Sequence, residues 1–145
     1  LGSDHSQLEL MRTFSGGSPV CAAGLEGLGL FQQAVQEWPS LEDPVPFITY
    51  FDNAIIKFGT GGGFFRNHFA EFLHWSVEQR PDIVDSSLAA LGDDLAAGWN
   101  GLSPVLQTLA GQPRDTSLWQ AVFNQLDTIC DQERTLFERL GSNLA

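Results

Sequence analysis

A run of glycines in the middle of the chain, Gly59-Thr60-Gly61-Gly62-Gly63, most constrains how this sequence can fold. Glycine loses more backbone freedom on folding than any other residue, so such a cluster indicates positive φ angles or close approach of the backbone to another group. The run follows an apolar segment and leads directly into another one. It therefore joins two elements of regular structure through a loop that few other residues could form.

Two interpretations of this run remain open. In the first, the loop and the helix N-terminus after it present unpaired backbone N–H groups and the positive end of the helix dipole to a phosphate, a carboxylate or a developing oxyanion. Arg66, one turn into that helix, would add charged donors. In the second, the run is only a tight turn between two helices that cross closely. Neither the GxGxxG fingerprint nor the GxxxxGK[ST] phosphate loop is present.

The composition indicates one globular domain with an aromatic core. The chain has 145 residues, which is enough to bury a core without disulfides. Hydrophobic residues make up 43% of it and charged residues 17%, with eleven phenylalanines and four tryptophans, so the chain is not of the disordered type.

The charge balance excludes some partner classes. The net charge is −11, and 18 acidic residues face only seven basic ones. Nucleic acids and anionic membranes bind to basic faces, so we expect neither as a partner. An amine-containing small molecule or another cationic partner is compatible with this charge.

Cysteine usage and hydropathy indicate a soluble protein of the cytoplasm. Cys21 and Cys130 are too few for a disulfide framework, and their spacing excludes CxxC patterns. No run of 18 apolar residues occurs, and the N-terminus lacks the basic and apolar regions of a signal peptide.

Apolar residues recur at helical spacing along the chain, and no segment shows convincing strand periodicity. We therefore predict an all-α fold, a single domain of five or six helices in an irregular bundle. Residues 1–20 are expected to form an N-terminal segment with a Gly/Ser linker, and residues 21–145 the helical domain. Besides a short helix at 7–14, the expected helices cover residues 22–38, 47–58, 64–78, 83–100, 104–110 and 116–140.

Local signals predict where these helices begin and end. Asp82 is the expected N-cap of one helix. The segment 101–104 is expected to kink or break that helix, with Ser103 as the next N-cap before a proline. Asp115 or Thr116 should cap the last helix, and Gly141 should end it. The helix after the glycine run is the most apolar, so we expect it to be central.

The densest set of polar side chains follows the glycine run: Arg66, His68, Glu71, His74 and Glu78. Glu71 and His74 form an ExxH pair on one helix face, as in carboxylate-bridged di-iron bundles. A second pair is missing, because the only other histidine is His5, and His68 and His74 lie on opposite sides of the helix. We therefore predict neither a metal site nor a cofactor.

A thiol nucleophile is a further hypothesis. Cys21 precedes a predicted helix, whose N-terminus could lower the pKa of the thiol, and His68 or His74 would have to serve as the base. The alternative is a small, half-buried residue at a helix start. Cys130 lies near the apolar face of the last helix and is expected to be a core residue. The catalytic residues therefore stay unassigned.

The segment from Gly59 to Arg66, GTGGG-x-F-R, continues as Phe69-Ala70-Glu71-Phe72-Leu73 and resembles the helical C-terminal domain of butirosin-biosynthesis-type acyltransferases. In that family a Tyr-Ala-Asp-Phe-Leu-like helix follows the run, and this chain has Phe69 and Glu71 in place of the tyrosine and the aspartate. The resemblance covers residues 22–141.

The resemblance implies a division of labour. The helical part of such enzymes follows a papain-like or peptidase-C39-like domain that carries a cysteine nucleophile, and the whole protein moves an acyl group from a carrier-protein thioester to an amine. This chain is then the accessory, substrate-positioning part. Its expected substrate-binding residues are Gly59, Thr60, Gly61, Gly62, Gly63 and Arg66.

The expected partners are a papain-like catalytic domain or a carrier protein, together with an amine-containing small molecule. The alternative is a stand-alone, non-catalytic helical binding module. The many aromatic residues also leave self-association as a homo-oligomer open.

Overall fold

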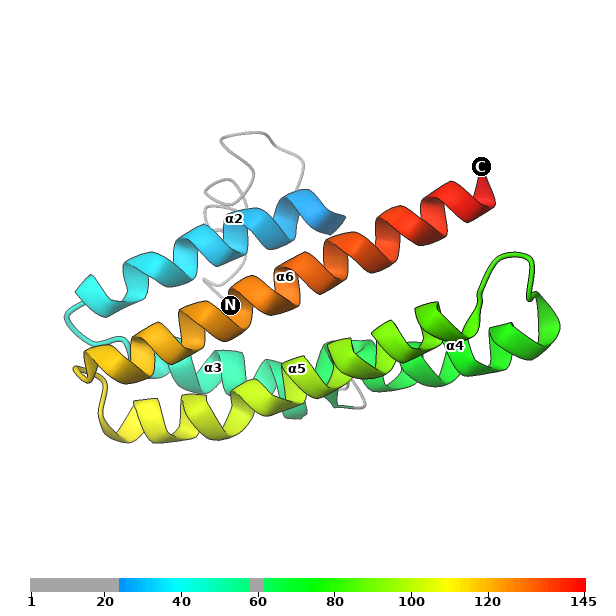
Figure 1. Ribbon diagram of the computed structural model, residues 1–145. Helices are drawn as coiled ribbons and strands as arrows, with labels where there is room; N and C mark the ends of the chain where they lie inside the picture. Colours follow the sequence, from blue (N-terminus) through cyan, green and yellow to red (C-terminus); the bar gives the residue numbers. More distant parts are fainter. Residues whose placement is uncertain (1–23, 58–61) are drawn as a thin grey trace, which may run out of the picture. The chain divides into compact units, whose positions relative to one another are not determined.

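The computed structural model describes residues 24–57 and 62–145, and every regular element within them is a helix. The expected helix at 7–14 and the loop residues 58–61 lie outside the described residues. The all-α prediction is confirmed, with five α-helices in the described ranges. The elements are α2 (Gly24–Glu37), η1 (Trp38–Ser40), α3 (Val45–Ile56), η2 (Gly63–Phe65), α4 (Arg66–Gln79), α5 (Ser86–Gly111) and α6 (Thr116–Leu144), where η denotes a 3₁₀ turn (Figure 1).

The chain divides into two compact units between Trp38 and Pro39. The first unit contains α2, where Phe31 contacts Trp38 edge to face with ring centroids 6.0 Å apart. The second contains α3 to α6. The predicted boundary between residues 20 and 21 falls outside the described residues and stays a prediction. In the ranges that the structure describes, no helix is both long enough and apolar enough to cross a membrane.

Helix α5 is the centre of the second unit, because it packs against α3, α4 and α6. Figure 1 shows the chain running out through α3 and α4, back along α5, and out again in α6. The side chains that α5 buries repeat every three or four residues, as one stripe of a helix should. They include Leu88, Leu95, Trp99, Leu102, Leu106 and Leu109.

The prediction that the helix after the glycine run is central is wrong. Helix α4 buries only Ala70, Leu73 and Ser76, a narrow stripe against α5. Phe72 is 53% exposed and Trp75 is 57% exposed. Aromatic residues on two sides of a helix raise its apolar content without specifying which side faces the core. A high apolar content therefore does not identify the central helix.

Helix α5 also runs without a break through Pro104, where a kink or a break was predicted. A proline inside a helix removes one backbone hydrogen bond and costs about 3 kcal/mol. The buried stripe continues in phase beyond it, and each buried leucine contributes roughly 1.5–3 kcal/mol, so packing outweighs the proline. Ser103 is therefore not an N-cap. Its hydroxyl donates a hydrogen bond to Asp52 of α3.

Two aspartates set the starts of the long helices. Asp85 caps α5 by accepting a hydrogen bond from the Leu88 N–H, and Asp115 caps α6 by accepting from two backbone N–H groups. The prediction for Asp115 is confirmed, but that for Asp82 is wrong. Asp82 instead accepts two hydrogen bonds from Arg80, at 3.0 and 2.8 Å.

Two further boundaries differ from the prediction. Helix α6 continues through Gly141 to Leu144, because Gly141 does not take the positive φ angle of a helix C-cap. Helix α3 begins at Val45, two residues earlier than expected, with Pro46 in its first turn. A proline is tolerated there because the first-turn N–H groups have no partner within the helix.

Replacing Pro104 by alanine should stabilise the protein, since Pro104 is exposed and its position in α5 can then donate a backbone hydrogen bond. We expect the free energy of unfolding in urea to rise by about 1–3 kcal/mol. The matched control is Pro46→Ala in the first turn of α3, which should change it by less than about 1 kcal/mol. Equal effects of the two changes would contradict this account of α5.

The two aspartate caps predict a loss of stability in acid. Hydrogen bonds from the Ser87 and Ser117 hydroxyls, and from nearby backbone N–H groups, lower the pKa of Asp85 and Asp115 below the usual 3.8. A carboxyl group with a lowered folded-state pKa stabilises the fold above its unfolded-state pKa, and this contribution disappears as the pH falls through the folded-state value.

Asparagine keeps the cap acceptor but does not titrate, so Asp85→Asn/Asp115→Asn is the matched variant. Between about pH 6 and about pH 3 we expect the Tm of the wild type to fall more steeply than that of the variant. Circular dichroism at a series of pH values measures both. Parallel curves would show that these caps contribute nothing to the acid transition.

Candidate functional site

The glycine-rich run ends in a turn whose φ angles are positive at four consecutive residues. They are 85° at Gly62, 60° at Gly63, 54° at Phe64 and 70° at Phe65. Glycine adopts such angles freely, but in a residue with a Cβ atom they cost roughly 1–2 kcal/mol each. We call residues 62–65 the left-handed turn. It leads directly into α4, so its strain must be offset by the contacts around it.

An asparagine pair leaves no space for side chains at the two glycines. Asn100 Nδ2 of α5 donates a hydrogen bond to Asn67 Oδ1 of α4, at 2.9 Å. A Cβ atom added at Gly62 would lie 2.5 Å from Asn67 Nδ2, and one at Gly63 would lie 2.6 Å from Asn67 Oδ1. The predictions of positive φ angles and of close approach are confirmed at these two positions.

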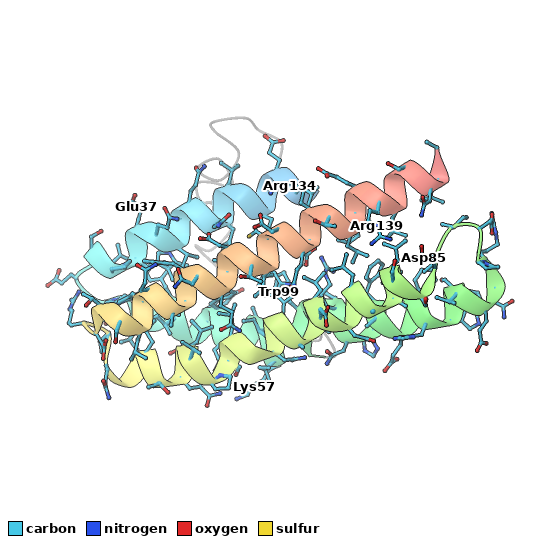
Figure 2. All side chains as sticks on the ribbon, in the orientation of Figure 1. Glu37, Lys57, Asp85, Trp99, Arg134 and Arg139 are labelled. Carbon is cyan, nitrogen blue, oxygen red and sulfur yellow. The ribbon has the colours of Figure 1, made fainter. Side chains whose placement is uncertain are left out.

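Arg66 binds a buried carboxylate. It is the first residue of α4, not one turn into the helix as predicted. Its Nε and one terminal nitrogen donate to the two carboxylate oxygens of Glu133, at 2.7 and 2.9 Å. The Trp99 indole Nε1 donates to the same carboxylate at 2.9 Å, and Figure 2 shows Trp99 between α5 and α6. Glu133 is only 2% exposed, so this network ties three helices together in the core.

Aromatic rings surround this network. The ring of Phe64 lies 5.1 Å from that of Trp99, measured between centroids. The guanidinium carbon of Arg66 lies 5.8 Å from the ring centre of Phe69 and 5.3 Å from that of Phe137. These contacts restrict Arg66 and Phe64, and with them the start of α4.

The start of α4 keeps donors for a ligand. Its N-cap residue, Phe65, supplies no side-chain hydrogen bond, and the Arg66 backbone N–H donates to the Gly63 carbonyl of the turn. The positive end of the helix dipole lies at this start. Arg66 has five N–H donors, of which Glu133 takes two. For the other three, the described part of the chain supplies no acceptor. Chemically, this arrangement can hold a carboxylate or a polarised carbonyl oxygen.

The structure thus brings together three of the six predicted substrate-binding residues, Gly62, Gly63 and Arg66. Gly59, Thr60 and Gly61 lie outside the described residues. The candidate site also contains Asn67, Asn100 and Glu133, which were not predicted as site residues.

A signal for Glu133 existed in the sequence. It lies in phase with Val122, Leu126, Ile129 and Leu136, the residues that α6 buries, and a carboxylate at such a position needs a buried partner. The two asparagines gave no comparable signal, because each lies on a different helix and only the fold pairs them.

The histidines of α4 have partners at the surface. His74 Nε2 lies 2.7 Å from Asp93 Oδ2 of α5. His68 Nδ1 lies 3.8 Å from Glu71 Oε2. The two members of the ExxH pair therefore have different partners. Among the residues that the structure describes, no three His, Cys, Asp or Glu side chains lie close enough to hold a metal ion.

Cys130 is a core residue, as predicted, with 4% of its surface exposed. Burial, with the nearby carboxylates of Asp127 and Glu133, raises the pKa of the Cys130 thiol to about 11. Such a thiol is a poor nucleophile at neutral pH. Cys21 lies outside the described residues.

These features define an all-α protein whose candidate site is a strained turn held by a buried ion pair. Residues 6–140 match the family described as Domain of unknown function (DUF4872), and because the match covers most of the chain, the protein belongs to this family. Comparisons with curated proteins and with solved structures found no match.

Replacing Arg66 by alanine should destabilise the protein by about 3–5 kcal/mol, because it leaves the buried carboxylate of Glu133 without its counter-charge. The double variant Arg66→Met/Glu133→Gln removes both charges and keeps an acceptor for Trp99, so it should recover most of this loss. Urea denaturation measures all three proteins. An unchanged Arg66→Ala variant would show that the pair does not support the fold.

Proposed function

We propose that this chain is the accessory, substrate-positioning helical domain of a secondary-metabolism acyltransferase, which moves an acyl group from a carrier-protein thioester to an amine. The observation that carries the proposal is the left-handed turn, where two phenylalanines keep strained backbone angles beside an uncapped helix N-terminus. Strain of this kind persists where surrounding contacts impose it, and it clusters at ligand-binding and active sites. The GTGGG-x-F-R resemblance supports the reaction class.

The reaction gives each group a defined task. The cysteine thiolate of a catalytic domain first forms a bond to the acyl carbon, and the carrier thiolate leaves. The amine nitrogen then forms a bond to the acyl carbon of this acyl-enzyme thioester, the C–S bond breaks, and the leaving cysteine thiolate takes up the proton that the amine loses. Negative charge develops on the acyl oxygen, and donors fixed in advance stabilise it. In our proposal the remaining donors of Arg66, beside the positive end of the α4 dipole, bind this oxygen. A papain-like catalytic domain supplies the nucleophile.

The partners follow from the same proposal. The net charge of −11 raises the local concentration of a cationic amine. Phe65, 55% exposed beside the donors, offers a ring surface for the arm of a carrier protein. We place the protein in the cytoplasm, where the free thiol of Cys130 stays reduced.

A stand-alone helical binding module is the second candidate. It is favoured by the large apolar side chains that the second unit exposes, since exposed apolar patches mark interaction sites. They are Phe47, Tyr50, Ile56, Phe64, Phe65, Phe72, Trp75 and Leu144. Such a surface would also serve self-association.

Replacing Phe65 by glycine separates strain from function. The change relieves a positive φ angle, so the free energy of unfolding should rise by about 1 kcal/mol. If the turn positions substrate, kcat/KM for transfer from an acyl-pantetheine thioester to a primary amine should fall by about tenfold. Mass spectrometry of the product, with the protein as its host produces it, measures the transfer.

The control is Phe47→Ala. Phe47 is another exposed aromatic residue, but it lies near the start of α3, at the end remote in sequence from the turn, so this change should leave transfer unchanged. Higher stability with unchanged transfer in Phe65→Gly would contradict a positioning role for the turn. No transfer by the wild-type protein, together with binding of the thioester, would favour the binding module.

A further inference from the structure

A groove of about 510 Å³ lies between α4 and α6, beyond the left-handed turn. Phe69, Phe72 and Trp75 of α4 form one wall and Phe137 and Leu140 of α6 form the other. Figure 1 shows the C-terminal part of α6, drawn in red, diverging from α4. We call this hollow the α4/α6 groove. It is distinct from the left-handed turn, but one of its walls belongs to α4, the helix that the turn leads into.

The dimensions of the groove suit a narrow ligand. On this side its lining extends from Phe69 in α4 to Arg80, the C-cap residue just beyond that helix, which corresponds to about 16 Å along the helix axis. Dividing the volume by this length gives a mean cross-section of about 32 Å². An α-helix with its side chains is roughly 10–12 Å across, so its cross-section is more than twice as large. The groove is therefore too narrow to enclose a partner helix, whereas a single extended chain fits within it.

The lining of the groove favours an aliphatic chain. Its two hydrophilic side chains are Ser76, whose hydroxyl donates to the Phe72 carbonyl at 2.8 Å, and the exposed Arg80, which uses two of its five N–H donors on Asp82. The other lining side chains are aromatic or aliphatic. Away from Arg80, a ligand segment with polar atoms would lose its hydrogen bonds to water here without replacing them.

One end of the groove lies beside Arg66. The rings of Phe69 and Phe137 stack across this end with their centroids 5.4 Å apart. The guanidinium carbon of Arg66 lies over both rings, at 5.8 and 5.3 Å. A chain that lies in the groove therefore brings its head close to the donors that Glu133 leaves open. A carboxylate or thioester carbonyl is the head that these donors suit.

We propose that the α4/α6 groove binds the aliphatic tail of an acyl chain whose carbonyl head lies at Arg66. The inference rests on the proposed function in one respect, the identification of this chain as the acyl group that is transferred. It narrows the acyl donors to those with an unbranched, apolar tail.

Gly141 offers a way to fill the groove without disturbing the fold. It lines the groove, and a Cβ atom added to it meets no other atom within 4 Å. Its φ angle is not positive, so leucine at this position in α6 is compatible with the helix. Gly111, the last residue of α5, is equally open but lies outside the lining, which makes Gly111→Leu the matched control.

The experiment is calorimetric titration of the full chain with decanoate and octanoate. Each buried methylene contributes about 0.8 kcal/mol, so we expect decanoate to bind roughly tenfold more tightly than octanoate. Gly141→Leu should weaken decanoate binding by at least about tenfold, because the new side chain displaces several methylenes. Gly111→Leu should bind decanoate as the wild type does.

Three outcomes would overturn the inference: no binding of decanoate, equal binding by Gly141→Leu, or a wild-type dimer in sedimentation that Gly141→Leu converts to a monomer. In the last case a second copy of the chain occupies the groove. Decanoate binding by a protein without transfer activity would support the groove assignment and contradict the proposed function.

Discussion

The buried ion pair between Arg66 and Glu133 is the interaction on which the rest of the second unit depends. Burying two charges is expensive, and an apolar pair of similar size is often at least as stable. The pair therefore contributes more to the positions of the helices than to the net free energy of unfolding. Glu133 accepts hydrogen bonds from Arg66 on α4 and from Trp99 on α5, so one carboxylate of α6 fixes how three helices meet. Helix α4 therefore cannot slide along its axis without breaking both hydrogen bonds between Arg66 and Glu133.

The left-handed turn adjoins the fixed start of α4. Arg66 is held by Glu133, and the chain changes direction into α4 over residues 62–65, all of which have positive φ angles. Gly62 and Gly63 take up part of this change, while Phe64 and Phe65 bear the strain. Contact of the Phe64 ring with Trp99 helps to offset the cost, and it connects the turn to the same buried network. A second tie, Arg139 of α6 with Asp85 at the start of α5, lies far from the turn (Figure 2).

The sequence predicted what local rules decide. Helical periodicity specified the class and most helix ranges, and a single cap residue, Asp115, specified the start of α6. It failed where two local rules conflict or where tertiary contacts decide. Pro104 is a helix breaker by propensity, yet packing on both sides of it keeps α5 continuous. The glycines at 62 and 63 were correctly read as special, but their reason, the Asn67 and Asn100 pair, connects two helices and leaves no trace in either segment.

Arg66 stands where the fold and the proposed function meet. Two of its donors hold Glu133, its guanidinium lies over the ring pair at the end of the α4/α6 groove, and it is itself the first residue of α4. A change at Arg66 therefore alters stability and ligand binding together and cannot separate them. Phe65 and Gly141 can, because one lies exposed in the turn and the other lines the groove. The geometry permits this separation. The core needs the charge of Arg66, whereas a ligand would also need the surfaces of the left-handed turn and of the α4/α6 groove, which lie on either side of Arg66.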